Sequence, residues 1–127
     1  MFMGLTKLQL LEDCIIWSQS NNIKLCAGGC LIRWSKVDGN IIPIEACPIG
    51  IALIRYGIVK YPSQKGWNKE ILQVFSCDPV WYRIVTFTWD YNISFLRPIK
   101  DTNPVEYHLD DTCRKVLELR KKFYEKL

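Results

Sequence analysis

The sequence contains a single histidine, His108, and only one pair of closely spaced cysteines, Cys26 and Cys30. Structural zinc sites are usually built from two such ligand pairs. The other cysteines stand singly in apolar or helical stretches, at Cys14, Cys47, Cys77 and Cys113. The pattern therefore does not predict a metal centre. If a zinc site did form, its candidates would be Cys26, Cys30 and Cys47, with Cys77 as a fourth ligand.

The chain also lacks a glycine-rich phosphate loop and a nucleophile elbow, which counts against the common enzyme classes. Its adjacent acid pairs, Glu12–Asp13 and Asp110–Asp111, would point in different directions on a helix and do not suit paired-carboxylate hydrolysis. A cysteine nucleophile with His108 as base is the enzymatic alternative. We expect no cofactor and assign no catalytic residue.

Long hydrophobic runs are absent as well. The longest, such as Ile49 to Ile54, are far shorter than the roughly 20 residues of a membrane-spanning helix. The first residues show no basic region followed by an apolar run and a cleavage site, so we expect no signal peptide. These observations predict a cytoplasmic protein without membrane contact, whose cysteines are reduced and pack as small apolar side chains.

What is present is the composition of one ordinary globular domain, spanning residues 1–127. Hydrophobic residues make up 49% of the chain and aromatic residues 13%, with five tryptophans. The net charge of +4 arises from 17 basic and 13 acidic residues, which is a mild excess and not a nucleic-acid signature. The aromatic rings must either fill a dense core or form a binding surface.

Local patterns predict several helices and one hairpin. Helices are expected over 6–20, with Thr6 as N-cap, over 47–57, with Pro48 in the first turn and Gly57 past the end, and over 68–75. The runs 30–37 and 40–44 flank Asp38-Gly39, a strong hairpin signal. Pro43 cannot donate to a ladder, so the second strand should be an edge strand or end near it.

Residues 78–92 allow two interpretations. Asp78-Pro79 suits a helix start, and Val80, Ile84, Phe87 and Tyr91 share a helical stripe. The composition is nevertheless β-prone, and a strand would place Trp81 and Trp89 on one face with Arg83. We favour the helix.

The C-terminal part should contain a short strand with a loop over 93–102, then a turn at Asn103–Pro104. A long amphipathic helix should follow, with Asp110 and Asp111 at its N-terminal end. The prediction is thus an α+β fold in which a hairpin packs against several helices.

Aromatic and arginine residues form the candidate binding surface, because this composition is favoured at hot spots and suits planar or anionic ligands. The candidates are Trp67, Arg55, Arg83, Trp81, Trp89, Arg33 and Trp34, with Tyr56 beside them. Trp67 leads the list because glycine, asparagine and lysine flank it.

These observations predict a small non-catalytic binding protein that acts on a protein partner or a small anionic or planar ligand. The first alternative is a nucleic-acid-binding protein that uses the basic C-terminal helix, although Glu118 and Glu125 interleave with its bases. The second is a cysteine-based enzyme or zinc module. Homo-oligomers could form through the C-terminal stripe or an exposed hairpin edge.

Overall fold

The structure is a computed structural model that describes residues 6–62, 66–92 and 104–125, with only the backbone given for 104–110. Within these ranges it is an α+β fold of five α-helices and a three-stranded sheet, which confirms the predicted fold class. The elements are α1 (Lys7–Gln19), β1 (Lys24–Leu25), β2 (Ile32–Val37), β3 (Asn40–Ala46), α2 (Pro48–Arg55), α3 (Asn68–Val74), α4 (Pro79–Tyr91), α5 (Pro104–Leu119) and a π-helical turn, η1 (Arg120–Tyr124).

Side-chain caps explain where three helices begin. Thr6 and Gln9 form a capping box at the start of α1. At α2 the Cys47 thiol accepts a hydrogen bond from the Gly50 N–H at 3.4 Å. At α4 an Asp78 oxygen accepts from the Trp81 N–H at 2.8 Å. The predicted helices over 6–20, 47–57, 68–75 and 78–92 are therefore confirmed, and the strand alternative for the last is excluded.

The hairpin is confirmed, but the expectation for Pro43 is wrong. Asp38 and Gly39 both have positive φ, at 51° and 82°, and connect β2 to β3. β3 runs past Pro43 to Ala46 and is the central strand, in the order β1-β3-β2. A register shift between Arg33 and Trp34 lies next to Pro43, and β1 pairs with β3 only at Glu45 and Ala46. Proline is accommodated because it lies at a bulge and its other side carries no ladder.

The C-terminal helix begins earlier than expected. Pro104 is the first residue of α5 rather than part of a turn, as its fixed φ allows at a helix start. Asp110 and Asp111 therefore lie inside the helix and not at its N-terminal end. The expected strand and loop over 93–102 lie outside the described residues.

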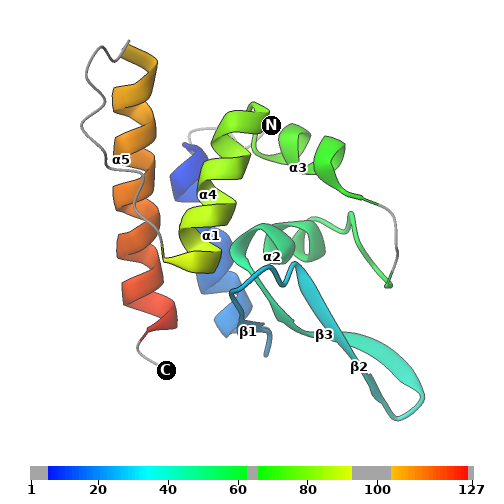
Figure 1. Ribbon diagram of the computed structural model, residues 1–127. Coiled ribbons are helices and arrows are strands. Elements are labelled where there is room, and N and C mark those ends of the chain that lie inside the picture. The colour runs from blue at the N-terminus through cyan, green and yellow to red at the C-terminus, as the bar shows by residue number, and fades with distance from the viewer. Residues whose placement is uncertain (1–5, 63–65, 93–103, 126–127) are drawn as a thin grey trace.

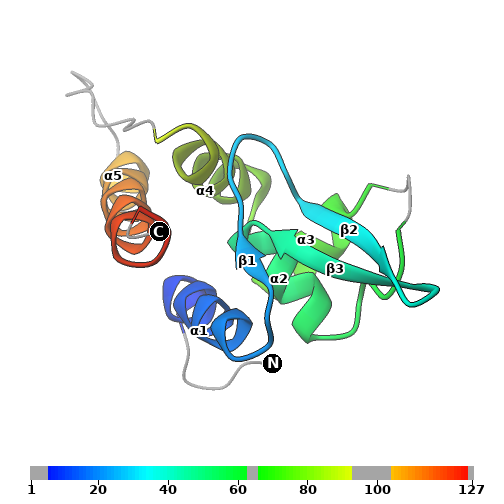
Figure 2. The same cartoon turned by 90° about the horizontal axis from the view of Figure 1, so that it is seen from below.

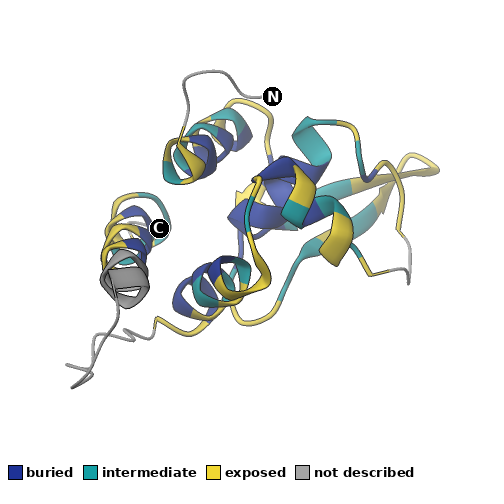
Figure 3. Cartoon of the chain, turned by 90° about the horizontal axis from the view of Figure 1, so that it is seen from above, coloured by how far each residue is buried: buried dark blue, intermediate teal, exposed yellow. Residues whose placement is uncertain are grey.

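In space, α1, α4 and α5 stand together on one side of the molecule, and the β2–β3 hairpin projects from the other side (Figures 1 and 2). α5 packs on both α1 and α4, and α2 packs on α1. The inward helix faces are buried while the hairpin tip is exposed (Figure 3). The core includes Leu11, Ile15, Ile51, Leu53 and Trp89, each almost completely buried.

None of the helices in the described part of the chain combines the length and the apolar character that crossing a membrane requires.

Candidate functional site

Two residues of the predicted binding surface, Trp81 and Trp89, lie in the core. Trp81 is 8% exposed and Trp89 is 1% exposed. Trp81 packs on Phe75, with ring centroids 5.6 Å apart. The indole N–H of Trp89 donates a hydrogen bond of 2.8 Å to the Cys26 carbonyl oxygen. On a helix covered by neighbours, large apolar rings on the inner stripe are removed from solvent, so neither ring can meet a ligand at the surface.

The other predicted residues do not gather in one place. Arg33 on β2 is exposed and lies 3.2 Å from Glu45 on β3. Trp34 on β2 and Trp67, directly before α3, are partly buried against the core. Arg83 is exposed on α4. These residues are therefore spread over the hairpin and two helices.

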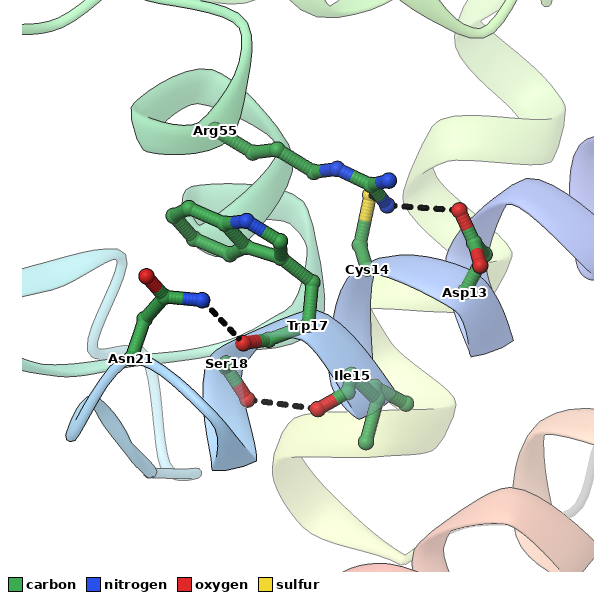
Figure 4. Close-up of polar contacts among 7 residues, drawn as sticks. All are labelled: Asp13, Cys14, Ile15, Trp17, Ser18, Asn21 and Arg55. Atoms are coloured by element: carbon green, nitrogen blue, oxygen red, sulfur yellow. Dashed lines mark hydrogen bonds and ion pairs between the residues drawn. The ribbon is translucent and has the colours of Figure 1, made fainter.

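Arg55 does have aromatic neighbours, but it is held by α1. Its guanidinium lies 2.6 Å from an Asp13 carboxylate oxygen. The same guanidinium lies 5.9 Å from the centroid of the Trp17 ring and 5.4 Å from that of Tyr56. Figure 4 shows the Arg55 and Asp13 side chains directed toward each other, with the Cys14 sulfur beside them. This Arg55–Asp13 cluster ties α2 to α1.

The thiols of the zinc hypothesis come near one another. The Cys26 thiol donates to the Cys30 carbonyl oxygen at 3.4 Å, and Cys30 and Cys47 line the same pocket. Cys77 lies in the turn between α3 and α4. Among the residues whose side chains are described, no three His, Cys, Asp or Glu are arranged to hold a metal ion. Burial raises the pKa of the Cys47 thiol to about 12, which leaves it protonated at neutral pH.

The histidine of the enzymatic alternative lies on α5 rather than in a polar loop. Its side chain is outside the described part of the structure.

A pocket of about 250 Å³ lies between the loop before β2, the start of α2 and the outer face of α4. We call it the Asp90 pocket. Its wall is mostly apolar, with two phenols, two thiols, one hydroxyl and one carboxyl group. The lining residues are Gly29, Cys30, Leu31, Cys47, Ile49, Tyr82, Thr86, Phe87, Asp90 and Tyr91.

Asp90 is the unusual member of this wall. The residue is only 8% exposed, and its Oδ1 is buried without a hydrogen bond from any described group. Burial raises the pKa of Asp90, while the backbone N–H groups of Gly29 and Gly28 and the charge of Arg120 act to lower it. Buried polar atoms nearly always have a partner, so an unsatisfied carboxylate oxygen at a pocket wall indicates a position that a ligand can complete.

Local sequence explains why the wall has this shape. Gly28 and Gly29 have φ of 85° and 92°, a conformation that side chains rarely adopt, and their amides face Asp90. Gly50 lets α2 approach β2, since a Cβ there would overlap the Leu31 carbonyl oxygen. The hydrogen bond from Trp89 to Cys26 then holds the loop against α4. The backbones of α2 and the residue before β2 thus approach each other closely at Gly50.

Asp90 was missed by sequence reasoning. It lies between Trp89 and Tyr91 near the end of an apolar helix, and nothing in the sequence around it distinguishes it from an ordinary polar residue. The available signal was that it is the only acidic residue within α4. A single acid in an apolar stretch needs hydrogen-bond donors. The donors are the amides of Gly28 and Gly29, about 60 residues earlier in the chain, which is too far for a local pattern to identify.

Two larger surface pockets are less informative. One, of about 390 Å³, lies between the end of α1, β1 and Phe123. The other, of about 400 Å³, lies between α1 and α5 and is lined by Glu12, Lys115 and Lys122 among others. Neither has, among its lining residues, a buried side-chain oxygen or nitrogen without a hydrogen-bond partner. The Asp90 pocket is therefore the better candidate site.

Comparison with models of known protein families finds no match, and comparisons with curated proteins and with solved structures find none either.

Proposed function

We propose that this chain is a non-catalytic binding protein whose small ligand occupies the Asp90 pocket. The observation that carries the proposal is the buried Oδ1 of Asp90, a residue that lines a mostly apolar pocket, because this oxygen accepts no hydrogen bond from any described group. A few well-placed polar groups in an apolar concavity are typical of small-molecule sites. Ligand binding would supply a hydrogen bond that the described residues do not give to this oxygen.

Two features support binding rather than catalysis. The Cys47 thiol at the pocket wall has a pKa raised to about 12 by burial, so it is a poor nucleophile. It also accepts a hydrogen bond from the Gly50 N–H and serves as the cap of α2, which is a structural role. None of the described residues that line the pocket is a histidine that could act as a general base.

The pocket changes the expected ligand chemistry. None of Arg33, Arg55 and Arg83 lines it, and its one acid disfavours an anion. The proposal therefore keeps the planar ligand and drops the anionic one. The basic residues of the C-terminal helix offer less support for nucleic-acid binding, because four of them have acidic neighbours: Arg114, Lys115, Arg120 and Lys122.

A library of single-ring compounds, titrated into ¹⁵N-labelled protein and followed by two-dimensional NMR, tests the proposal. We expect some compounds to shift the amide signals of Cys30, Thr86 and Tyr91. Thr86→Phe places a ring in the pocket and should abolish these shifts, whereas the isosteric Thr86→Val should retain them. If no compound shifts these signals, or if all shifts map to the pocket between α1 and α5, the proposal is wrong.

The second candidate function is self-association through the hairpin. β2 is an edge strand, and Val37, Ile41 and Ile42 are exposed on the projecting hairpin (Figures 1 and 3). A free strand edge beside exposed apolar side chains is a ready site for pairing with a second copy. Light scattering over a concentration series should show dimers that Ile41→Lys removes. A monomer at all concentrations contradicts this candidate.

We also propose that the chain works in a reducing compartment such as the cytoplasm. All six cysteines are free, including the neighbouring Cys26 and Cys30. Thiol labelling of protein freshly isolated under denaturing conditions should modify all six, and an intramolecular disulfide in that material would contradict the proposal.

A further inference from the structure

We propose that the Asp90 pocket selects a small planar cation, an amidinium or guanidinium group on a compact apolar body. This inference rests on the proposed function and names its ligand class. The positive group would pair with the Asp90 carboxylate, and the apolar body would contact Leu31, Ile49 and Phe87.

The charge of the pocket wall favours a cationic ligand. Among the described residues that line the pocket, Asp90 is the only Asp, Glu, Lys or Arg. Its Oδ1 accepts no hydrogen bond from a described group, although the residue is more than nine-tenths buried. The terminal torsion of a carboxylate is soft, so either oxygen can turn toward a donor. An N–H group of a cation supplies both the missing hydrogen bond and the missing counter-charge.

Arg120 is the nearest internal competitor for this role, since its charge acts on Asp90. Its guanidinium is already engaged elsewhere. The Arg120 Nε donates to the Trp89 carbonyl oxygen at 2.8 Å, and one terminal nitrogen lies 2.6 Å from a Glu125 oxygen. Arg120 is not among the described residues that line the pocket. The place of a directly paired cation is therefore left to a ligand.

Size and aromatic content define the rest of the ligand. A volume of about 250 Å³ is below the range of roughly 300–1,000 Å³ typical of drug-sized ligands, which favours a single ring. Phe87 and Tyr91 are exposed, lie one helical turn apart, and have ring centroids 5.9 Å from each other. Aromatic faces attract cations and planar groups. The wall thus presents one carboxylate and two rings to the same small volume.

A charge series of equal shape tests the inference. Benzamidine is a cation, benzamide its neutral counterpart and benzoate its anionic counterpart. Calorimetric or NMR titration of the unaltered full chain should show benzamidine binding at least tenfold more tightly than benzamide, and benzoate more weakly than both. Asp90→Asn should reduce the ratio of benzamidine to benzamide affinity to within threefold. The matched control, Asp111→Asn on the exposed face of α5, removes the same charge and should leave the ratio unchanged.

The results separate this inference from the proposed function. If benzamide binds in the pocket as tightly as benzamidine, the ligand class is wrong and the small-molecule site stands. If the ratio survives Asp90→Asn, or if benzamidine shifts only signals distant from Cys30 and Thr86, the assignment to Asp90 is wrong. The series on the unaltered chain needs no variant, so a folding defect in Asp90→Asn cannot hide a negative result.

Discussion

Arg55 and Asp90 are both charged side chains withdrawn from solvent, yet the protein treats them differently. The Arg55 side chain is 25% exposed and lies 2.6 Å from an Asp13 oxygen, with two aromatic rings within 6 Å of its guanidinium. Asp90 is 8% exposed, and one of its oxygens has no hydrogen bond from a described group. The first arrangement joins two helices and is complete in itself. The second costs stability, because a buried polar group without a hydrogen bond is unfavourable, and such a cost is expected at the binding site that we propose.

The largest expected effect comes from disturbing the close contact between α2 and the residue before β2, which forms part of the Asp90 pocket. In Gly50→Ala the new Cβ would overlap the Leu31 carbonyl oxygen, so β2 and α2 must move apart. We expect a loss of about 3 kcal/mol in the free energy of unfolding. Urea denaturation measures it. Gly66→Ala, where a Cβ meets nothing within 4 Å, is the control and should change little. Equal stability of the two variants would contradict the close approach.

The next largest effect should come from Trp89→Phe. This change removes a hydrogen bond of 2.8 Å to the Cys26 carbonyl oxygen and leaves a small cavity in the core. We expect a loss of about 2 kcal/mol and faster amide exchange in the 26–31 loop, because the loop loses its anchor on α4. Trp34→Phe, at a partly buried site on β2, should cost less. A loop with unchanged exchange would show that Trp89 does not hold it.

Unlike the two changes above, Asp90→Asn should raise the free energy of unfolding of the free protein, by about 1 kcal/mol at pH 7. Burial raises the folded-state pKa of Asp90 above its ordinary 3.8. The difference in the free energy of unfolding between wild type and variant therefore favours the wild type most below pH 3.8. It shifts toward the variant as the pH rises through the folded-state pKa of Asp90. Cys47, Tyr82 and Arg120 also surround this carboxyl, and both proteins share them. Urea denaturation across pH 3 to 7 measures the difference, and a wild type that gains relative to the variant with rising pH would contradict it.

The smallest effect concerns the paired side of the comparison. A double-mutant cycle with Arg55→Met and Asp13→Asn should give a coupling free energy of about 0.5 kcal/mol in favour of the ion pair. The coupling should fall at high salt, because both side chains are partly exposed. A coupling near zero at low salt would mean that Arg55 stabilises α1 against α2 only by packing on Trp17 and Tyr56.

Much of the fold followed from local patterns. The capping box at Thr6, the proline starts of α2 and α4, and the Asp38-Gly39 turn each act within a few residues, so spacing alone predicts them. One error arose where a distant partner decides, because Pro43 is tolerated in the central strand only since β1 pairs with β3 at Glu45 and Ala46 and not at Pro43. The other error was local, since α5 begins at Pro104 rather than after it.

The candidate site shows most clearly the difference between what local sequence patterns determine and what contacts between distant elements determine. The sequence by itself determined the helices over 6–20, 47–57, 68–75 and 78–92 and the turn at Asp38-Gly39. Only the tertiary structure decided that Trp81 and Trp89 are buried and that Arg55 meets Asp13. It also decided that the loop around Cys26 lies against α4, 63 residues later, and encloses Asp90. Burial and hydrogen-bond partners depend on contacts between elements far apart in the chain, whereas helix caps and turns depend on neighbours along it.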